Sequence, residues 1–261
     1  MSKESLVTGS AENQEHKEII EHHHESLKVA LKEQADKLRK DGFDVDDDAR
    51  ISVQKFKDFF SANTFDDDVE AVRKLDASID AGAKTEEGAR VRGEVLEMAK
   101  TIIFNSEIFG GRLVALRTTK YDDYKNGVDE MIIDRQTGEA MAALDTTTDL
   151  SSKMQAPAIM KRVAGGCRVK YGLKLDVDTN QISRYTHNRL PLFIISVSIE
   201  NLAKAAQSIV TGVSNEYRKE LEEYFKSSFV GQAKAASDVE AINVNVRAAY
   251  SRVAQIFDSI K

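Results

Sequence analysis

The stretch Tyr121–Asp149, YDDYKNGVDEMIIDRQTGEAMAALDTTTD, decides how the middle of the chain folds. Two short runs within it, 130–134 and 139–145, carry apolar side chains bounded by charged ones. Thr137-Gly138 lies between the runs, and a glycine at such a point is typical of the tight turn that joins two antiparallel strands. The sequence therefore predicts a β-hairpin.

An acidic residue stands at each open end of this hairpin. Asp129 follows Gly127 at the entrance of the first strand, and Asp145 lies at the exit of the second. Because a hairpin brings these ends together, the two carboxylates are expected to face one small volume, as in sites that bind a divalent cation for phosphodiester chemistry. The alternative is that both acids cap turns and remain solvated.

Composition limits the class of protein. The chain has 261 residues, of which 41% are apolar and 31% charged, as expected of a soluble globular protein. No apolar run approaches the roughly 18 residues that cross a bilayer, and the N-terminus lacks the apolar core of a secretory signal. The single cysteine, Cys167, excludes an internal disulfide and a cysteine-based zinc site. These features predict a cytoplasmic protein with no membrane partner, and they leave its oligomeric state open.

The charge is unevenly distributed. The net charge of −6 argues against a general nucleic-acid coat protein. Residues 151–190, however, hold only two acids against eight basic residues: Lys153, Lys161, Arg162, Arg168, Lys170, Lys174, Arg184 and Arg189. This segment follows the acidic hairpin, so it could form a phosphate-facing groove in which Lys161, Arg162, Arg168 and Lys170 contact nucleic acid. It could equally dock on the protein's own acidic helices.

The order of patterns predicts an α/β or α+β fold with a small central sheet, a β-hairpin flanked by helices, and helical extensions at both ends. The predicted divisions are a helical N-terminal extension over 1–85, a core over 86–210, and C-terminal helices packed on the core over 211–261. Within the first division a helix is expected after the acidic cluster 44–48, carrying Ile51 and Phe56. A further helix is expected over 153–164, and interruptions near Gly212 and Gly231.

Several other motifs are absent or incomplete. His22, His23 and His24 are consecutive, and on a helix they point about 100° apart, so they cannot converge on one ion. The acidic runs that start at Asp44 and Asp176 lack the turn glycine and the closing glutamate of a calcium loop. No phosphate-binding glycine loop and no serine nucleophile elbow occurs.

A helix bearing an acid, a strand opened by Gly127-Val-Asp129, a turn, and a strand that ends in Ala143-Leu-Asp145-Thr-Thr147 together resemble the PD-(D/E)XK restriction-endonuclease-like superfamily. The resemblance covers roughly residues 86–197. It implies that the carboxylates hold one or two divalent cations, Mg²⁺ or Mn²⁺. It also implies that a lysine two residues after the second-strand acid helps to activate the attacking water.

This chain departs from that pattern because position 147 is threonine, which brings no positive charge. Lys170 is the best candidate for a lysine that has migrated, with Lys161 behind it. The acid expected on the helix over 85–104 is Glu94, about 100° from the centre of the apolar stripe, whereas Glu97 points nearly opposite. Asp122 or Asp123 could serve instead.

Two functions follow as hypotheses. In the first, the protein is a nuclease-like protein that acts on or binds nucleic acid, in which Glu94, Asp129 and Asp145 ligate the metal and Lys170 stands near the scissile phosphate. In the second, a nuclease-like fold without catalysis serves as a structural or protein-interaction module. The threonine at position 147 and the acidic total charge favour the second hypothesis.

Overall fold

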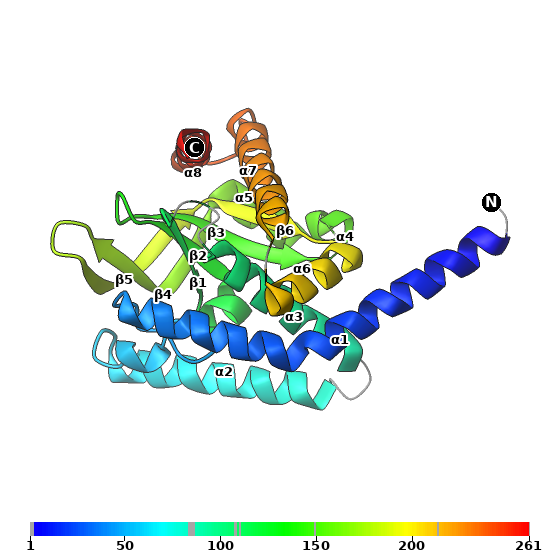
Figure 1. Cartoon of the computed structure of the whole chain (residues 1–261). Coiled ribbons are helices and arrows are strands. Elements are labelled where there is room, and N and C mark those ends of the chain that lie inside the picture. The colour runs from blue at the N-terminus through cyan, green and yellow to red at the C-terminus, as the bar shows by residue number, and fades with distance from the viewer. Residues whose placement is uncertain are drawn as a thin grey trace.

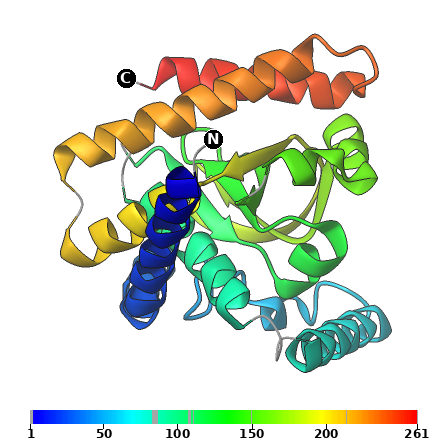
Figure 2. The same cartoon turned by 90° about the vertical axis from the view of Figure 1, so that its right-hand side faces the viewer.

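A computed structural model describes residues 3–82, 87–106, 109, 111–148, 150–212 and 214–260, with side chains from residue 14 onward except 80–82 and 87–89. The predicted boundary between residues 85 and 86 lies outside the described residues. Figures 1 and 2 give two views of the chain, which are related by a 90° turn.

A four-stranded mixed sheet forms the centre, in the order β1-β2-β3-β6. β1 pairs with β2 and β2 with β3 in antiparallel fashion, whereas β3 and β6 run parallel. A parallel pair needs a crossover connection, and here the segment between β3 and β6 supplies it. The strands of this sheet are β1 (Leu113–Arg117), β2 (Glu130–Asp134), β3 (Ala140–Thr147) and β6 (Leu192–Ser196).

Helices cover both faces of the sheet, with α7 and α8 on one side and α1, α3 and α6 on the other, as both views show (Figures 1 and 2). α2 lies further out on the α1 and α3 side. The long helices are α1 (Lys3–Lys40), α2 (Ala62–Gly82), α3 (Glu87–Phe104), α6 (Ile199–Thr211), α7 (Asn215–Ser237) and α8 (Val244–Ser259). The short ones are α4 (Leu150–Gln155), α5 (Pro157–Gly165), the 3₁₀ turn η1 (Val53–Phe56) and the π-helical turn η3 (Asp122–Asn126).

The hairpin alternates its side chains between two hydrophobic cores. Met131 and Ile133 belong to the core on the α1 and α3 side, whereas Ile132 belongs to the core under α7 and α8. In β3, Ala143 faces the first core and Leu144 the second. This period of two confirms the predicted hairpin, and the turn glycine Gly138 has a φ of +74°, a conformation that favours glycine.

A second, two-stranded sheet consists of β4 (Cys167–Asp176) and β5 (Gln181–Leu190), which pair antiparallel. The alternation of polar and apolar residues over 168–175 predicts the first of these strands, and the run Val-Asp-Thr-Asn-Gln at 177–181 predicts the turn, but no strand was expected between that turn and Pro191. Two expected helices differ as well. The residues around Ile51 and Phe56 form only η1, and the helix expected over 153–164 divides at Ala156, where Pro157 begins α5. Helix α7 runs through Gly231 without a break.

The fold is therefore a mixed α+β arrangement, as the sequence predicted: a small central sheet with a hairpin, flanked by helices and with helices at both ends. The N-terminal helix is part of this arrangement, because Leu27 and Leu31 of α1 lie in the same core as Met131 and Ile133. Among the helices in the described part of the chain, none combines the length and the apolar character needed to cross a membrane.

Candidate functional site

Asp129 and Asp145 lie where the strand pairing of the hairpin ends. Met131 pairs with Ala143 and Glu130 with Leu144, and the N–H of Asp129 donates a hydrogen bond of 2.9 Å to the same residue, Leu144. Asp129 and Glu130 both lie near Lys100 of α3, whereas Asp145 contacts Lys153 of α4. The two aspartates thus lie at the same open end of the hairpin but contact different helices.

A hollow of about 380 Å³ opens at this end of the sheet, between α3, the end of β3, α4 and the start of α6. The residues that line it include Glu97, Asp129, Asp145, Thr146, Thr147 and Lys153. The hollow therefore contains both predicted carboxylates and the threonine that stands where the resembled family keeps a lysine.

Asp129 is held from two sides. Its Oδ2 accepts hydrogen bonds from the backbone N–H of Thr146, at 2.8 Å, and from the hydroxyl of the same residue. The Nζ of Lys100, on α3, lies 3.8 Å from that oxygen and donates a hydrogen bond of 3.2 Å to the Thr146 hydroxyl. The Lys100 side chain is only 2% exposed. Lys100 thus holds a buried positive charge behind Asp129 and Thr146, which line the hollow.

Lys100 also faces the fully buried carboxyl of Glu130, whose Oε2 lies 3.4 Å from Lys100 Nζ. Burial raises the pKa of Glu130, against the opposing effect of Lys100. Glu130 Oε1 accepts a hydrogen bond from Thr101, whereas Oε2 accepts none from the described residues. A buried oxygen without a hydrogen-bond donor costs free energy, which makes the ammonium of Lys100 important to both acids.

Asp145 is paired with two cations. The Nζ of Lys153, on α4, forms an ion pair with Oδ1 of Asp145 and donates a hydrogen bond of 2.9 Å to the backbone oxygen of Thr146. The guanidinium of Arg162 lies 3.7 Å from Oδ2. Burial, and after it the negative charge of Asp129, raise the pKa of the Asp145 carboxyl. The mutual repulsion follows from the placement of both carboxylates at one hollow.

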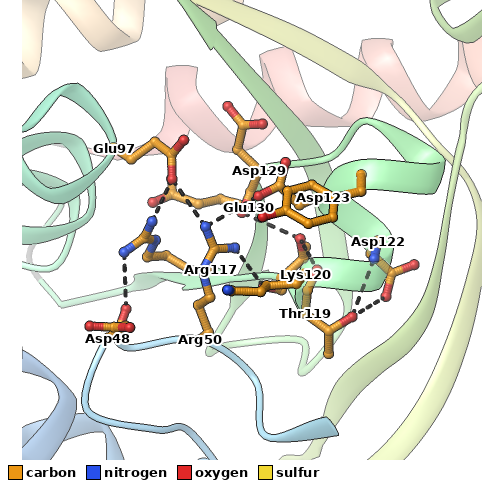
Figure 3. Close-up of polar contacts among 12 residues, drawn as sticks. Asp48, Arg50, Glu97, Arg117, Thr119, Lys120, Asp122, Asp123, Asp129 and Glu130 are labelled. Atoms are coloured by element: carbon orange, nitrogen blue, oxygen red, sulfur yellow. Dashed lines mark hydrogen bonds and ion pairs between the residues drawn. The ribbon is translucent and has the colours of Figure 1, made fainter. Parts of the chain in front are cut away.

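The helix acid in the hollow is Glu97, not the predicted Glu94. Glu94 lies one turn earlier on α3 and bonds to His24 at 2.9 Å. Glu97 contacts the guanidinium groups of Arg50, at 3.1 Å, and Arg117 (Figure 3). Helix α3 has more than the one packing surface that the choice of Glu94 assumed. Residues 98–101 are all buried, so the polar side of the helix is covered as well.

Lys170 does not reach the hollow. Its ammonium forms an ion pair with Asp68 of α2 and lies 5.0 Å, 5.0 Å and 5.3 Å from the ring centroids of Phe60, Tyr121 and Tyr171. These five residues form the aromatic lysine cluster. The assignment of Lys170 as a catalytic or nucleic-acid-binding residue is corrected accordingly: its charge is buried in a structural contact, and Lys100 and Lys153 supply the ammonium groups of the site.

The adjacent acids Asp122 and Asp123 have separate roles. Asp122 is fully buried and accepts hydrogen bonds from the backbone N–H groups of Lys170, at 2.7 Å, and Tyr171, at 3.0 Å. It therefore holds β4 in place and is not a ligand in the hollow. Asp123 lies 3.2 Å from Arg50, the guanidinium that also contacts Glu97 (Figure 3). Burial raises the pKa of Asp123 to about 6.

The predicted basic groove is only partly available. Lys161 and Arg168 are exposed. Arg162 is half-buried and donates hydrogen bonds to the backbone oxygens of Gly127 and, at 3.2 Å, Asn126. Gly127 has a φ of +62°, and a side chain there would occupy the position of the Arg162 guanidinium. Part of the basic segment thus docks on the protein itself, with Arg162 on the hairpin entrance and Lys170 on Asp68 of helix α2.

Among the residues that the structure describes, no group of three or more histidine, cysteine, aspartate or glutamate side chains lies close enough to hold a metal ion. Asp129 and Asp145 nevertheless supply hard carboxylate oxygens. Mg²⁺ is usually bound through one or two carboxylates, with water and substrate phosphates completing its octahedron. The described residues thus offer two carboxylates at most to a cation, both of them near basic side chains.

Comparisons of the chain with protein-family models, with curated proteins and with solved structures give no match.

Proposed function

We propose that this protein is a nuclease-like protein that binds nucleic acid at the hollow and hydrolyses a phosphodiester bond with the help of a divalent cation. The observation that carries the proposal is the pair of carboxylates, Asp129 and Asp145, that line one hollow, with Lys100 of α3 beside Asp129. Two carboxylates beside a fixed ammonium suit a phosphate that gains negative charge in the transition state.

Each residue has a role in this proposal. Asp129 and Asp145 would hold Mg²⁺ or Mn²⁺, which supplies a Lewis acid for the phosphoryl oxygen and lowers the pKa of bound water. Lys100, held against Asp129 and Thr146, would stabilise charge on the phosphate. Thr147 lines the hollow. Exposed Lys161 and Arg168 would contact phosphates further along the strand.

The likeness to the PD-(D/E)XK superfamily, proposed from the sequence, gains support from the order of elements. A helix with an acid and a lysine precedes the hairpin, the hairpin carries one acid at each open end, and α4 and α5 follow. Position 147 remains a departure from that family's pattern. The proposal therefore assigns the missing charge to Lys100, which lies three residues after Glu97 on α3.

The test compares wild-type protein with Asp129→Asn and Asp145→Asn. With Mn²⁺ present, the wild type is expected to cleave labelled single-stranded or duplex DNA or RNA, and each variant to lose at least about 100-fold in rate, because a carboxylate ligand is lost. Mn²⁺ should also raise the melting temperature of the wild type but not of the variants. Asp178→Asn, in the exposed β4–β5 turn, is the matched control and should behave like the wild type.

The alternative is an interaction module on the same fold without catalysis. It is favoured by the cations already in place, because Arg50 and Arg117 neutralise Glu97, and Lys153 neutralises Asp145. Suppose that the wild type stays folded, binds no Mn²⁺ and cleaves neither DNA nor RNA, whether single-stranded or duplex. The catalytic proposal then fails, and this alternative replaces it.

A further inference from the structure

Two lysines reach the carboxylates from elements of different character. Lys100 projects from α3, a helix of 18 residues, and its side chain is 2% exposed. Lys153 projects from α4, a helix of six residues of which none is buried, and its side chain is 25% exposed. The first lysine is part of the core, whereas the second is carried by a segment with little burial to hold it.

The position of Lys153 is that of a cation ligated by oxygen. Its ammonium contacts Asp145 Oδ1 and the backbone oxygen of Thr146, two oxygens at the end of β3. On the rest of α4, Leu150 and Met154 are 44% and 37% exposed. The contacts of Lys153 are therefore a main attachment of α4 to the hollow, and they use the same carboxylate that the proposed function assigns to a metal.

We propose that Lys153 is a built-in counter-cation for Asp145, which a divalent cation replaces when it binds, so that α4 is released from the hollow. The inference rests on the proposed function. Without metal, Asp145 is a buried carboxylate next to the like charge of Asp129, and an ammonium offsets the cost of that arrangement. A dication between the two aspartates neutralises both charges and repels the ammonium.

This exchange makes Lys153 the residue that sets the affinity of the hollow for divalent cations. Removal of its charge leaves the two aspartates under-neutralised and vacates one carboxylate oxygen, so the metal no longer has to displace a competitor. Lys100 does not take part in the exchange, because it is enclosed between Asp129, Glu130 and Thr146. One lysine thus stays in the core next to Asp129, while the other yields its place.

The experiment measures Mn²⁺ affinity by isothermal titration calorimetry in wild type, Lys153→Ala, Lys153→Gln and Lys161→Ala. Both Lys153 variants are expected to bind Mn²⁺ about tenfold more tightly than wild type, since a competing unit charge next to the ligand is removed. Lys161→Ala makes the same change of charge on the neighbouring helix α5, where the side chain is exposed, and should shift the affinity less than about twofold.

A second measurement follows α4 itself. Amide hydrogen exchange of residues 150–155 should quicken in wild type when Mn²⁺ is added, because the ammonium leaves its oxygens and the helix loses an attachment. In Lys153→Ala the same amides should already exchange fast without Mn²⁺. Equal affinities in wild type and Lys153→Ala, or exchange that Mn²⁺ leaves unchanged, would overturn the inference.

The failure of the proposed function is recognised separately. If Asp129→Asn binds Mn²⁺ as wild type does, the ion is not at the hairpin, and both proposals fall. If Asp129→Asn loses the ion while the Lys153 variants match wild type, the metal site stands and only the counter-cation role of Lys153 is refuted.

Discussion

The hollow and the aromatic lysine cluster both pair lysine with aspartate, yet they are built differently. In the cluster, Lys170 and Asp68 are 9% and 14% exposed, and three rings enclose the ammonium. In the hollow, Lys153 and Asp145 lie on the wall of a 380 Å³ opening, and a second carboxylate, that of Asp129, lines the same opening. An ion pair alone does not mark a functional site; access and a neighbouring like charge distinguish the candidate.

The turn η3 connects the two regions. Asp122 accepts hydrogen bonds from the β4 backbone beside the cluster, whereas the next residue, Asp123, faces Arg50 at the edge of the hollow. Asp122 and Asp123 therefore serve different parts of the molecule although they are adjacent in the sequence. One substitution in the aromatic lysine cluster and one in the hollow test whether the two regions differ in their contribution to stability.

The largest effect is expected in the cluster. Asp68→Asn removes the counter-charge of Lys170 and the acceptor of the 2.6 Å hydrogen bond from the Tyr171 hydroxyl. Because the ammonium stays buried without its partner, the free energy of unfolding should fall by about 2–4 kcal/mol. Urea denaturation followed by circular dichroism measures the loss.

The matched control lies on the same helix. Asp76→Asn weakens the pair with Lys120, which is 49% exposed, and should cost about 1 kcal/mol or less. If both variants lose the same free energy of unfolding, the ion pair of the cluster contributes no more to stability than a surface ion pair. The contrast with the hollow would then fail.

A pH dependence is expected at the edge of the hollow. Burial raises the pKa of Asp123 to about 6 in the folded protein; the charge of Arg50 acts against this shift, and the charges of Asp129 and Glu97 add to it. In the unfolded chain the pKa of this carboxyl is about 4. Between these values the folded state holds a proton that the unfolded state releases. The stability of wild type relative to Asp123→Asn should therefore fall as pH rises from about 4 to about 6.

The measurement is a set of urea denaturation curves for both proteins across that pH range. A difference that stays constant with pH would mean that Asp123 is already ionised at pH 4, and that Arg50 outweighs burial at this edge of the hollow. In that case the side chains of Arg50, Glu97 and Asp123 form an ion-pair cluster in which Asp123 stays charged over this pH range.

The sequence was sufficient for the hairpin and its two carboxylates because both follow from short-range rules. A period of two assigns faces, and one turn fixes the register that brings the open ends of the hairpin, with Asp129 and Asp145, to one hollow. The same rules also predicted most helices, since their apolar stripes are long. Where a helix carrying Ile51 and Phe56 was expected, only a 3₁₀ turn over Val53–Phe56 forms. Tertiary contacts, among them the hydrogen bond from Ile51 N–H to Arg117 O, compete with helix formation there.

The remaining members of the site depend on contacts between distant segments. Glu97 lies in the hollow because Arg50 and Arg117 approach it from a loop and from β1. The lysines could not be chosen by spacing, since Lys100 precedes the hairpin by 29 residues and Lys153 follows Asp145 by eight. A usable signal was present in α3, where Glu97 and Lys100 are three residues apart and share a helical side.

The smallest stability effect is expected for Asp145→Asn, although it makes the same chemical change as Asp68→Asn. The variant loses ion pairs with Lys153 and Arg162, but those side chains are 25% and 23% exposed, so water can solvate them. It also relieves the burial of the carboxylate and its repulsion by Asp129, the two causes that raise its pKa. The free energy of unfolding should change by less than about 1 kcal/mol. A loss as large as that of Asp68→Asn, measured in the same urea series, would make Asp145 a structural anchor like Asp68. If the free energy of unfolding hardly changes while Mn²⁺ binding is lost, Asp145 contributes to the chemistry of the site and not to stability.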